Sequence, residues 1–271
     1  MAMYLSEKGY RVDIYERRPD MRKTNISAGR SINLAVSKRG ITALEEIGVF
    51  HKISSKLIPM YGRIIHDIDG STRFLPYGRP DQYINSVSRS ELNILLMTEA
   101  EKTDRIRILF QHSCSGMDLE SGTVFIANEV NGDQVTLQGT PVIAADGSGS
   151  AVRESMIESG HISGSFDPLG HSYKELSIPP DKSDEFQLEP NALHIWPRGK
   201  FMLIALPNMD RSFTVTLFLP NTGDISFSTV RSLDDLNILF EKNFPDVLEF
   251  IPNLQTDYFS NPTGKLGTVR C

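Results

Sequence analysis

The fold of this chain is decided by the segment Ala144-Ala145-Asp146-Gly147-Ser148-Gly149-Ser150-Ala151-Val152-Arg153. An apolar run from Val142 to Ala145, of the kind found in buried strands, leads into a glycine-rich turn, and Ser150 to Ile157 then has the pattern of a helix. Glycines let the backbone approach an anion, and a helix N-terminus offers free N–H groups to a phosphate. Asp146 and Gly147 are therefore candidates for binding a phosphate-bearing cofactor in an α/β fold. An ordinary strand-to-helix turn is the alternative.

A second α/β signal stands at the start of the chain. Ala2 to Lys8 is predicted to be a helix that ends at Gly9, and Tyr10 to Tyr15 a strand that ends at Glu16. An acidic residue at the carboxyl end of the second strand of a Rossmann βαβ unit can accept hydrogen bonds from the ribose hydroxyls of an adenine nucleotide. Glu16 is a candidate for that role. A solvated loop glutamate is the alternative, because no Gly-x-Gly-x-x-Gly turn precedes it.

Helices and hairpins follow in the middle of the chain. Helices are predicted from Ser37 to Val49 and from Ser88, where Glu91 completes a capping box. Asp69-Gly70 and Asn131-Gly132 predict two tight hairpins. The first joins 63–67 to 71–75, and the second joins 124–130 to 134–137. The segments 29–35 and 86–89 have the polarity of ordinary loops before helices.

After about residue 165 the pattern becomes mostly antiparallel. Four strands are predicted, separated by proline, glycine or asparagine: 172–178, 192–196, 201–206 and 213–219. One clear helix follows them, Leu233 to Phe244, which is opened by Ser232 with Asp235 three residues on. The sequence thus predicts an α/β half followed by an antiparallel half.

Composition excludes several classes of protein. The chain has 271 residues, of which 39% are hydrophobic and 23% charged, as in an ordinary globular protein. Its longest apolar run, Phe201 to Leu206, is far shorter than the roughly 20 residues of a transmembrane helix. Only two cysteines occur, Cys114 and Cys271, and no secretory signal opens the chain, which predicts a cytoplasmic protein. The net charge of −6 argues against nucleic acid as a partner.

The histidines show no spacing typical of metal ligands, and no nucleophile elbow accompanies them. A metal site and a Ser-His-Asp hydrolase are therefore not expected, and the histidines are interpreted as structural or surface residues. They include His66, His112, His161, His171 and His194.

Several segments taken together resemble one family, the aromatic-ring flavin hydroxylases of the p-hydroxybenzoate hydroxylase type, and within it the branch that hydroxylates kynurenine. The segments are Gly29-Arg30-Ser31-Ile32-Asn33-Leu34-Ala35, Ser86-Val87-Ser88-Arg89, Asp146-Gly147 with Arg153, Leu193-His194-Ile195-Trp196-Pro197-Arg198 and Ile204-Ala205-Leu206-Pro207-Asn208. The resemblance covers essentially the whole chain.

The resemblance implies an FAD/NAD(P)-binding Rossmann-like α/β domain with an antiparallel β-sheet substrate domain. Residues 1–165 would form the FAD-binding domain, interrupted by 61–83, which would join the substrate domain at 166–271. The cofactor site would contain Glu16, Arg17, Arg18, Ala35, Arg89, Cys114, Asp146 and Gly147. The substrate site would contain Arg63 and Tyr77, which grip a carboxylate, and Ile204, Leu206 and Phe218, which wall the aromatic ring.

The activity that this resemblance implies is a flavin-based hydroxylation. FAD, reduced by NADPH, would use dioxygen to convert L-kynurenine to 3-hydroxykynurenine, on the tryptophan-degrading route towards quinolinate and NAD. No side chain is expected to be an obligatory acid or base, because the flavin carries the chemistry. A related hydroxylase of another aromatic acid and a catalytically silent binding domain remain alternatives.

The chain departs from the family at both ends. The family begins with a strand and a Gly-x-Gly-x-x-Gly turn, whereas Met1 already lies in the helix that would follow it. The family also carries a later Gly-Asp motif that this sequence does not reach. An internal fragment or a truncated gene model is therefore expected.

Overall fold

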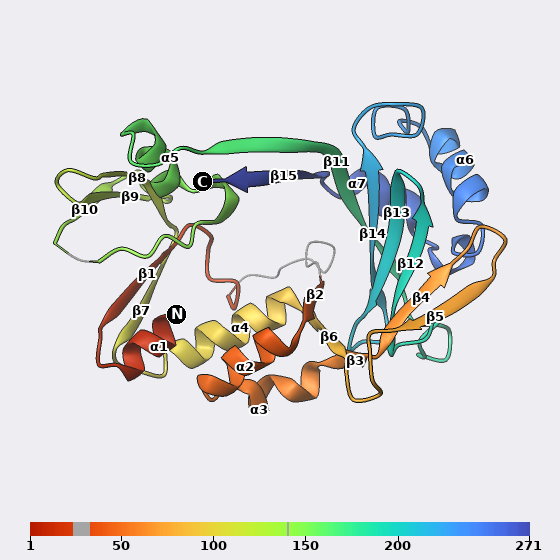
Figure 1. Ribbon diagram of the computed structural model, residues 1–271, viewed down its shortest axis with the longest axis horizontal. Coiled ribbons are helices and arrows are strands. Elements are labelled where there is room, and N and C mark those ends of the chain that lie inside the picture. Colours follow the sequence, from red (N-terminus) through yellow and green to blue (C-terminus); the bar gives the residue numbers. More distant parts are fainter. Residues whose placement is uncertain (24–32, 140) are drawn as a thin grey trace. The chain divides into compact units, whose positions relative to one another are not determined.

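The structure is a computed structural model that describes residues 1–23, 33–139 and 141–271, and it divides into two compact units (Figure 1). Unit 1 comprises Met1–Ile26, Leu96–Asp167 and Gly267–Cys271, and unit 2 comprises Ser27–Leu95 and Pro168–Leu266. The mixed α/β architecture predicted from the sequence is confirmed.

Unit 1 combines a parallel strand pair with a small antiparallel sheet. Helix α1 (Ala2–Glu7) leads into β1 (Val12–Glu16), which pairs in parallel with β7 (Ile106–Phe110). Strands β8 (His112–Asp118), β9 (Thr123–Asn128) and β10 (Gln134–Leu137) form a three-stranded antiparallel sheet. The predicted Asn131-Gly132 hairpin joins β9 to β10, and Gly132 has the positive φ of +76° that such a turn requires.

Helix α5 (Ala151–Glu158) confirms the predicted helix after the glycine-rich turn. The Ser155 hydroxyl on α5 accepts a hydrogen bond of 3.0 Å from the Met117 backbone N–H, which attaches the helix to β8. A 3₁₀ turn, Gly147–Gly149, precedes it.

The prediction of a buried strand from Val142 to Ala145 is wrong. These residues are irregular and exposed, with Ile143 at 57% of its full exposure. A strand forms only where its backbone pairs with a neighbouring strand, and no described strand pairs with residues 142–145. Apolar composition cannot supply the pairing partner, so the run stays outside the sheet.

The main sheet, most of which lies in unit 2, has seven strands in the order β15-β11-β14-β13-β12-β4-β5. The strands are β4 (Gly62–His66), β5 (Thr72–Pro76), β11 (Ser165–Ile178), β12 (Ala192–Arg198), β13 (Phe201–Pro207), β14 (Phe213–Pro220) and β15 (Gly264–Arg270). Strand β4 pairs in parallel with β12, so the predicted Asp69-Gly70 hairpin joins the late strands, as expected.

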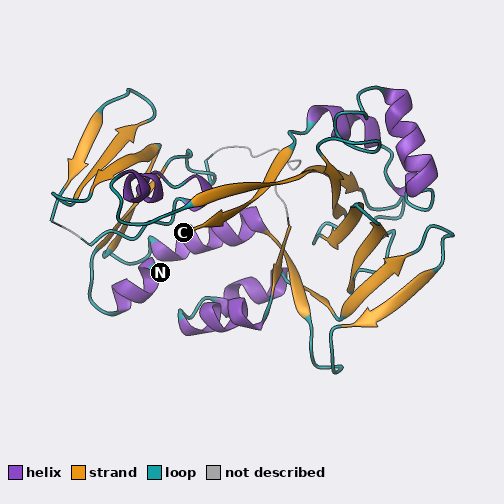
Figure 2. Ribbon diagram, turned by 45° about the horizontal axis from the view of Figure 1, so that its top comes forward, coloured by secondary structure: helices purple, strands orange, loops and turns teal. Residues whose placement is uncertain are grey.

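One face of the main sheet is the core of unit 2. Helix α6 (Leu233–Asn243), the short turn Leu248–Phe250 and helix α7 (Leu254–Ser260) contribute to the same core cluster as β11 to β14 (Figure 2). Trp196, Leu203 and Phe240 are fully buried there. Helix α7 was not predicted, because only Leu254 and Tyr258 of its seven residues are buried and so short a stretch has no clear period.

Unit 2 also contains a smaller antiparallel sheet in the order β2-β6-β3, made of β2 (Asn33–Val36), β3 (Ile58–Met60) and β6 (Ile84–Ser88). The helices of this part of the chain are α2 (Lys38–Glu46), α3 (Phe50–Ile53), the 3₁₀ turn Ser54–Lys56 and α4 (Arg89–Ala100), of which α4 belongs to unit 2 up to Leu95. No helix in the described ranges is long and apolar enough to cross a membrane.

The loop prediction for 29–35 and 86–89 is therefore wrong in its described part. Leu34 pairs with Val87 and Ala35 with Ser86 in an antiparallel ladder, while residues 29–32 lie outside the described residues. The polar side chains that suggested loops are buried and hydrogen-bonded to one another, as in Asn33 and Ser86. A buried polar side chain is compatible with a strand when it has such a partner.

Candidate functional site

The Asp146-Gly147 turn is open to solvent in front of α5. The Asp146 carboxylate accepts a hydrogen bond of 2.9 Å from the Ala151 backbone N–H, and the Ser150 hydroxyl accepts one of 3.0 Å from the Arg153 N–H. Gly147 has φ +82°, and a Cβ built on it would meet nothing within 4 Å. Backbone conformation rather than crowding thus calls for glycine here, and space remains beside the turn.

Glu16 lies at the carboxyl end of β1, where the sequence predicted it. Its Oε1 accepts a hydrogen bond of 2.8 Å from the Arg18 backbone N–H, and the side chain keeps 40% of its exposure. Arg17 and Arg18 are exposed beside it. Asp13, three residues earlier, is instead held by Arg107 through contacts of 3.0 and 2.6 Å. Glu16 also lies 3.6 Å from the Arg18 Nε, and its half-exposed carboxylate is the one that a ligand at the strand end can reach.

Cys114 lies on β8 beside a bulge between Cys114 and Gly116. Its Sγ lies 3.6 Å from the Gly116 carbonyl oxygen. Burial raises the pKa of the Cys114 thiol, and the nearby charge of Asp146 raises it further. The thiol is thus neutral near pH 7, which suits a wall of a site rather than a nucleophile.

Arg63 and Tyr77 come together, as the hairpin predicted. Gly62 pairs with Pro76, and the Tyr77 backbone N–H donates to the Tyr61 carbonyl at 3.0 Å, which extends the pairing by a residue. The Arg63 guanidinium carbon lies 5.3 Å from the centre of the Tyr77 ring. Burial raises the pKa of Tyr77, while the Arg63 charge acts to lower it. The phenol therefore keeps its proton and can donate it to an anion.

The apolar residues predicted for the substrate lie on the same face of the main sheet as Arg63. Ile65, Ile195 and Ile204 are aligned across β4, β12 and β13, and Arg63 lies two residues from Ile65. Leu206 follows Ile204 by two residues, and Phe218 on β14 pairs with Met202. This face lies opposite the one that carries Trp196 and Leu203 into the core.

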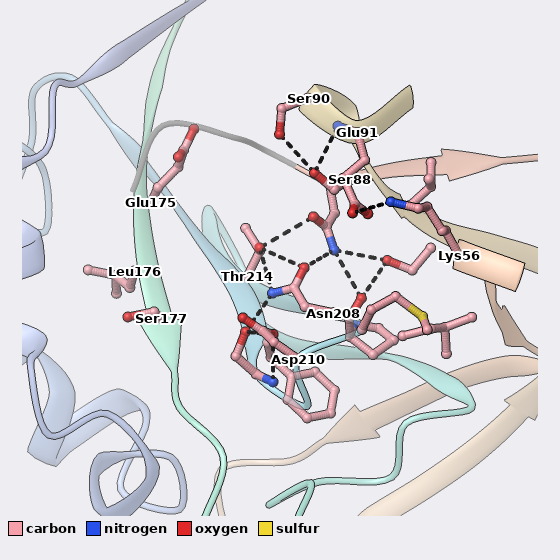
Figure 3. A pocket seen from close by; sticks show the side chains of 18 of the residues that line it. Lys56, Ser88, Ser90, Glu91, Glu175, Leu176, Ser177, Asn208, Asp210 and Thr214 are labelled. Atoms are coloured by element: carbon pink, nitrogen blue, oxygen red, sulfur yellow. Dashed lines mark hydrogen bonds and ion pairs between the residues drawn. The ribbon is translucent and has the colours of Figure 1, made fainter. Parts of the chain in front are cut away.

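A polar pocket of about 440 Å³ lies within unit 2 between β11, the end of β13 and the start of α4 (Figure 3). Figure 3 shows Asn208 and Thr214 in a hydrogen-bonded cluster, with Glu91 paired to Lys56 at 2.8 Å. Glu175 faces this pocket from β11. Burial raises the pKa of Glu175, and the charge of Arg89 lowers it.

Sequence reasoning missed most of this pocket. Asn33, Glu175, Asn208 and Thr214 were not proposed as site residues, although the alternation of Glu175 with Ser177 along β11 marks a polar strand face. Asn33 stands in a segment that was interpreted as a loop.

The predicted cofactor residues are divided between the two units. Glu16, Arg17, Arg18, Cys114, Asp146 and Gly147 belong to unit 1, and Ala35 and Arg89 to unit 2. Ala35 is exposed on β2, and Arg89 is the first residue of α4. The predicted substrate residues all belong to unit 2.

Comparison with known proteins defines the class. Residues 1–174 match the family model described as FAD binding domain, so the chain belongs to the FAD-binding domain family. Among solved structures, 2-methyl-3-hydroxypyridine-5-carboxylic acid oxygenase has a TM-score of 0.72 at 17% identity, over 99% of this chain and 66% of that one. Klebsiella pneumoniae HpxO, solved with FAD and uric acid, has a TM-score of 0.68 at 16% identity, over 99% of this chain and 64% of that one. These two likenesses establish the fold.

The particular relatives are proteins named kynurenine 3-monooxygenase. That of Myxococcus xanthus (strain DK1622) is 44% identical over 100% of this chain and 58% of its own length. That of Legionella pneumophila (strain Corby) is 41% identical over 100% of this chain and 60% of its own length. The chain thus spans about 60% of the length of these relatives.

Proposed function

We propose that the natural protein carrying this chain is an FAD-dependent monooxygenase that converts L-kynurenine to 3-hydroxykynurenine with NADPH and dioxygen. The observation that carries the proposal is the placement of Arg63, beside Tyr77, on the same sheet face as Ile204 and Leu206. The relatives named kynurenine 3-monooxygenase support the choice of substrate.

The residues present fit FAD. Glu16 offers a carboxylate at the end of a parallel strand, which suits the ribose hydroxyls, and the open Asp146-Gly147 turn offers backbone groups to the cofactor. Arg17 and Arg18 would stand beside the ribose, and Ala35, Arg89 and Cys114 would line the flavin. When bound, FAD supplies the redox chemistry, taking electrons from NADPH and delivering one oxygen atom of dioxygen to the ring.

The chain's own residues would bind and orient the substrate. The Arg63 guanidinium can pair with a carboxylate through two parallel hydrogen bonds, and the Tyr77 hydroxyl can donate a third. Ile204, Leu206 and Phe218 would wall the aromatic ring and exclude water, which protects the reacting species from wasteful side reactions. We name no side chain as an obligatory acid or base.

We also propose the domain division expected from the sequence, with FAD binding in residues 1–165 and substrate binding in 166–271 together with 61–83. Strand β4 supports it, because the hairpin inside 61–83 pairs with β12. The cysteine composition supports the cytoplasm as the location.

The test uses the purified protein as its natural gene encodes it. It should be yellow, oxidise NADPH faster when L-kynurenine is added, and form a product heavier by one oxygen atom. A panel of other aromatic acids should give slower oxidation. NADPH oxidation that responds to another acid but not to kynurenine would transfer the activity to that acid, and a protein without flavin would overturn the proposal.

A further inference from the structure

We infer that Asn33 is a positioning residue that holds β2, the strand of the cofactor-lining Ala35, against the end of β13, the strand of the substrate-lining Ile204 and Leu206. This inference rests on the proposed function. Asn33 is only 6% exposed and is the first residue of β2. It stands where the smaller sheet of unit 2 contacts the main sheet.

The hydrogen bonds of Asn33 cross from one sheet to the other. Its Nδ2 lies 3.0 Å from the Pro207 carbonyl oxygen, 3.0 Å from the Ser86 hydroxyl and 2.6 Å from Asn208 Oδ1. A carbonyl oxygen can only accept, so the Asn33 atom that faces Pro207 must be the amide nitrogen. The Asn208 atom that faces this nitrogen is then its oxygen, which leaves the Asn208 Nδ2 to donate to Thr214 at 3.1 Å.

The Pro207 carbonyl receives a second donor from the same small sheet. The Ser86 hydroxyl on β6 donates to it at 2.8 Å, and Ser86 is the residue that pairs with Ala35. The strand of Ala35, β2, and its pairing partner, β6, are therefore both tied to one carbonyl, that of Pro207, which directly follows Leu206. Three polar side chains meeting in a buried place constrain each other strongly, because any of them left unpaired would carry a desolvation penalty.

This arrangement selects asparagine at position 33. Aspartate would place acceptor oxygens against the Pro207 carbonyl, and alanine would leave Asn208 Oδ1 without its shortest donor. Leucine has a similar volume but no donor. Only an amide of this length donates to Pro207 and Asn208 at once.

We call the contacts of Asn33 and Ser86 with the Pro207 carbonyl the joint. Loss of this joint would change which product forms, 3-hydroxykynurenine or hydrogen peroxide, more than it would change the oxidation of NADPH. In the productive route, NADPH, a proton, dioxygen and kynurenine give NADP⁺, water and 3-hydroxykynurenine. If the ring is displaced from its reacting position, NADPH, a proton and dioxygen give NADP⁺ and hydrogen peroxide instead. A displacement of about 1 Å can slow a step by up to about a hundredfold, so the peroxide route gains when the wall that carries Leu206 shifts.

The first experiment measures product formed per NADPH consumed at saturating kynurenine in Asn33→Ala. We expect this yield to fall roughly threefold or more, with hydrogen peroxide making up the difference and with flavin content unchanged. The matched control is Asn243→Ala, which removes another asparagine bond to a carbonyl, the 2.8 Å bond to Leu239 at the end of α6. It should keep the original yield. Ser86→Ala removes the second donor and should lower the yield in the same direction by less.

A second measurement does not depend on activity. Hydrogen exchange of the backbone amides should become faster in Asn33→Ala both in β2 and at Ala205 and Leu206, whereas in Asn243→Ala the increase should be confined to α6. An unchanged yield in a folded Asn33→Ala protein, or in Ser86→Ala where the first variant does not fold, would overturn the inference. So would faster exchange in β2 alone. If the unmodified protein forms no hydroxylated product, the proposed function fails, and hydrogen exchange still decides whether the joint exists.

Discussion

At the scale of single residues, the proposed carboxylate site depends on the shape of arginine at position 63 and not only on its charge. The guanidinium lies beside the Tyr77 ring at 5.3 Å from its centre. Lysine would keep the positive charge but lose the planar pair of donors that matches a carboxylate. We therefore expect Arg63→Lys to raise the dissociation constant for kynurenine about tenfold or more, a cost of about 1.4 kcal/mol. Titration of kynurenine into both proteins at equal flavin content checks this.

The same hairpin offers a control for Arg63. Arg73 also stands on it, and its Nε donates to Asp67 at 3.1 Å with both side chains largely exposed. Exposed ion pairs contribute little to stability. Arg73→Lys should therefore leave kynurenine affinity unchanged. Equal affinities in Arg63→Lys and the unmodified protein would remove Arg63 from the site.

Glu16 supports a second prediction at the same scale. A carboxylate that accepts hydrogen bonds from ribose hydroxyls contributes on the order of 1.5–3 kcal/mol, so Glu16→Ala should weaken FAD binding about tenfold or more. Kynurenine affinity of the flavin-loaded protein should change little. Asp13→Asn, which disturbs only the exposed contact with Arg107, is the control. Equal losses for flavin and substrate in Glu16→Ala would show that Glu16 has a structural role instead.

At the scale of elements, α6 shows how a sequence signal becomes a stable helix end. The Ser232 hydroxyl accepts a hydrogen bond of 3.2 Å from the Asp235 N–H, and the Asp235 carboxylate accepts one of 2.9 Å from the Ser232 N–H. These reciprocal bonds are the capping box that the sequence predicted. The cap matters for the stability of unit 2 because α6 buries Leu236, Leu239 and Phe240 in the core.

Removing the cap should therefore destabilise unit 2. We expect Ser232→Ala to lower the free energy of unfolding by about 1 kcal/mol, measured as a shift of the urea midpoint. Ser232→Thr keeps a hydroxyl at the cap and should retain most of the stability that Ser232→Ala loses. An unchanged midpoint in Ser232→Ala would mean that core packing alone holds α6 in place.

Signals within a few residues explain which elements the sequence could predict. The two Xaa-Gly hairpins, the α6 cap and the apolar strands β11 to β14 all follow from neighbouring residues, and all are confirmed. The predictions for β2 and for the run from Val142 to Ala145 are both wrong, and for one reason. The first predicted a loop where the structure has a strand, and the second predicted a strand where the structure is irregular. A strand exists only with a partner: β2, which opens with the polar Asn33, has β6 as its partner, whereas apolar 142–145 has none among the described residues.

The same limit applies to the candidate site. The Arg63–Tyr77 contact could be predicted because a hairpin of known register connects the two residues. The joint at Asn33 could not, because Asn33 and Pro207 are 174 positions apart and no local pattern relates them. Resemblance to a family pointed to Ala35 and Leu206, but not to the asparagine that ties their strands together.

At the scale of the whole molecule, sheet pairing buries two histidines that are far apart in the sequence. The parallel pairing of β4 with β12 places His66 Nε2 2.8 Å from His194 Nδ1, and His66 Nδ1 lies 3.2 Å from the Asp246 carboxylate. Asp246 also accepts the indole N–H of Trp196 at 2.7 Å. The sequence predicts that these histidines are structural or surface residues, and both are buried in the structure. Hydrogen bonding within the core accounts for them without a ligand.

This buried cluster makes the stability of unit 2 depend on pH. Burial lowers the pKa of His194 to about 4, although its bond to the Glu189 carbonyl acts in the opposite direction. In the unfolded chain the group takes up a proton at its ordinary pKa, about 6.5. Between these values the unfolded state binds more protons than the folded one, so the free energy of unfolding falls as the pH falls from about 6.5 to about 4, by up to about 3 kcal/mol.

Asp246 acts at lower pH. Burial alone would raise its pKa, but the hydrogen bonds from His66 and Trp196 lower it overall. The stability that it contributes is present above its ordinary pKa and is lost as the pH falls through the lowered one. The two groups therefore act in successive pH windows, and the interval from pH 6.5 to 4 lies above that of Asp246.

Urea unfolding across pH 4 to 7 tests this in the unmodified protein and in His194→Gln. The glutamine amide can accept from His66 and donate to Glu189, but it does not titrate. We expect the decline in the free energy of unfolding between pH 6.5 and 4 to be several-fold smaller in His194→Gln, with a similar stability at pH 7. Replacing His171, which is only partly buried, in the same way should leave the decline unchanged. A decline that persists in full in His194→Gln would place its origin in other titrating groups, and would mean that His194 takes up its proton no differently from the unfolded chain.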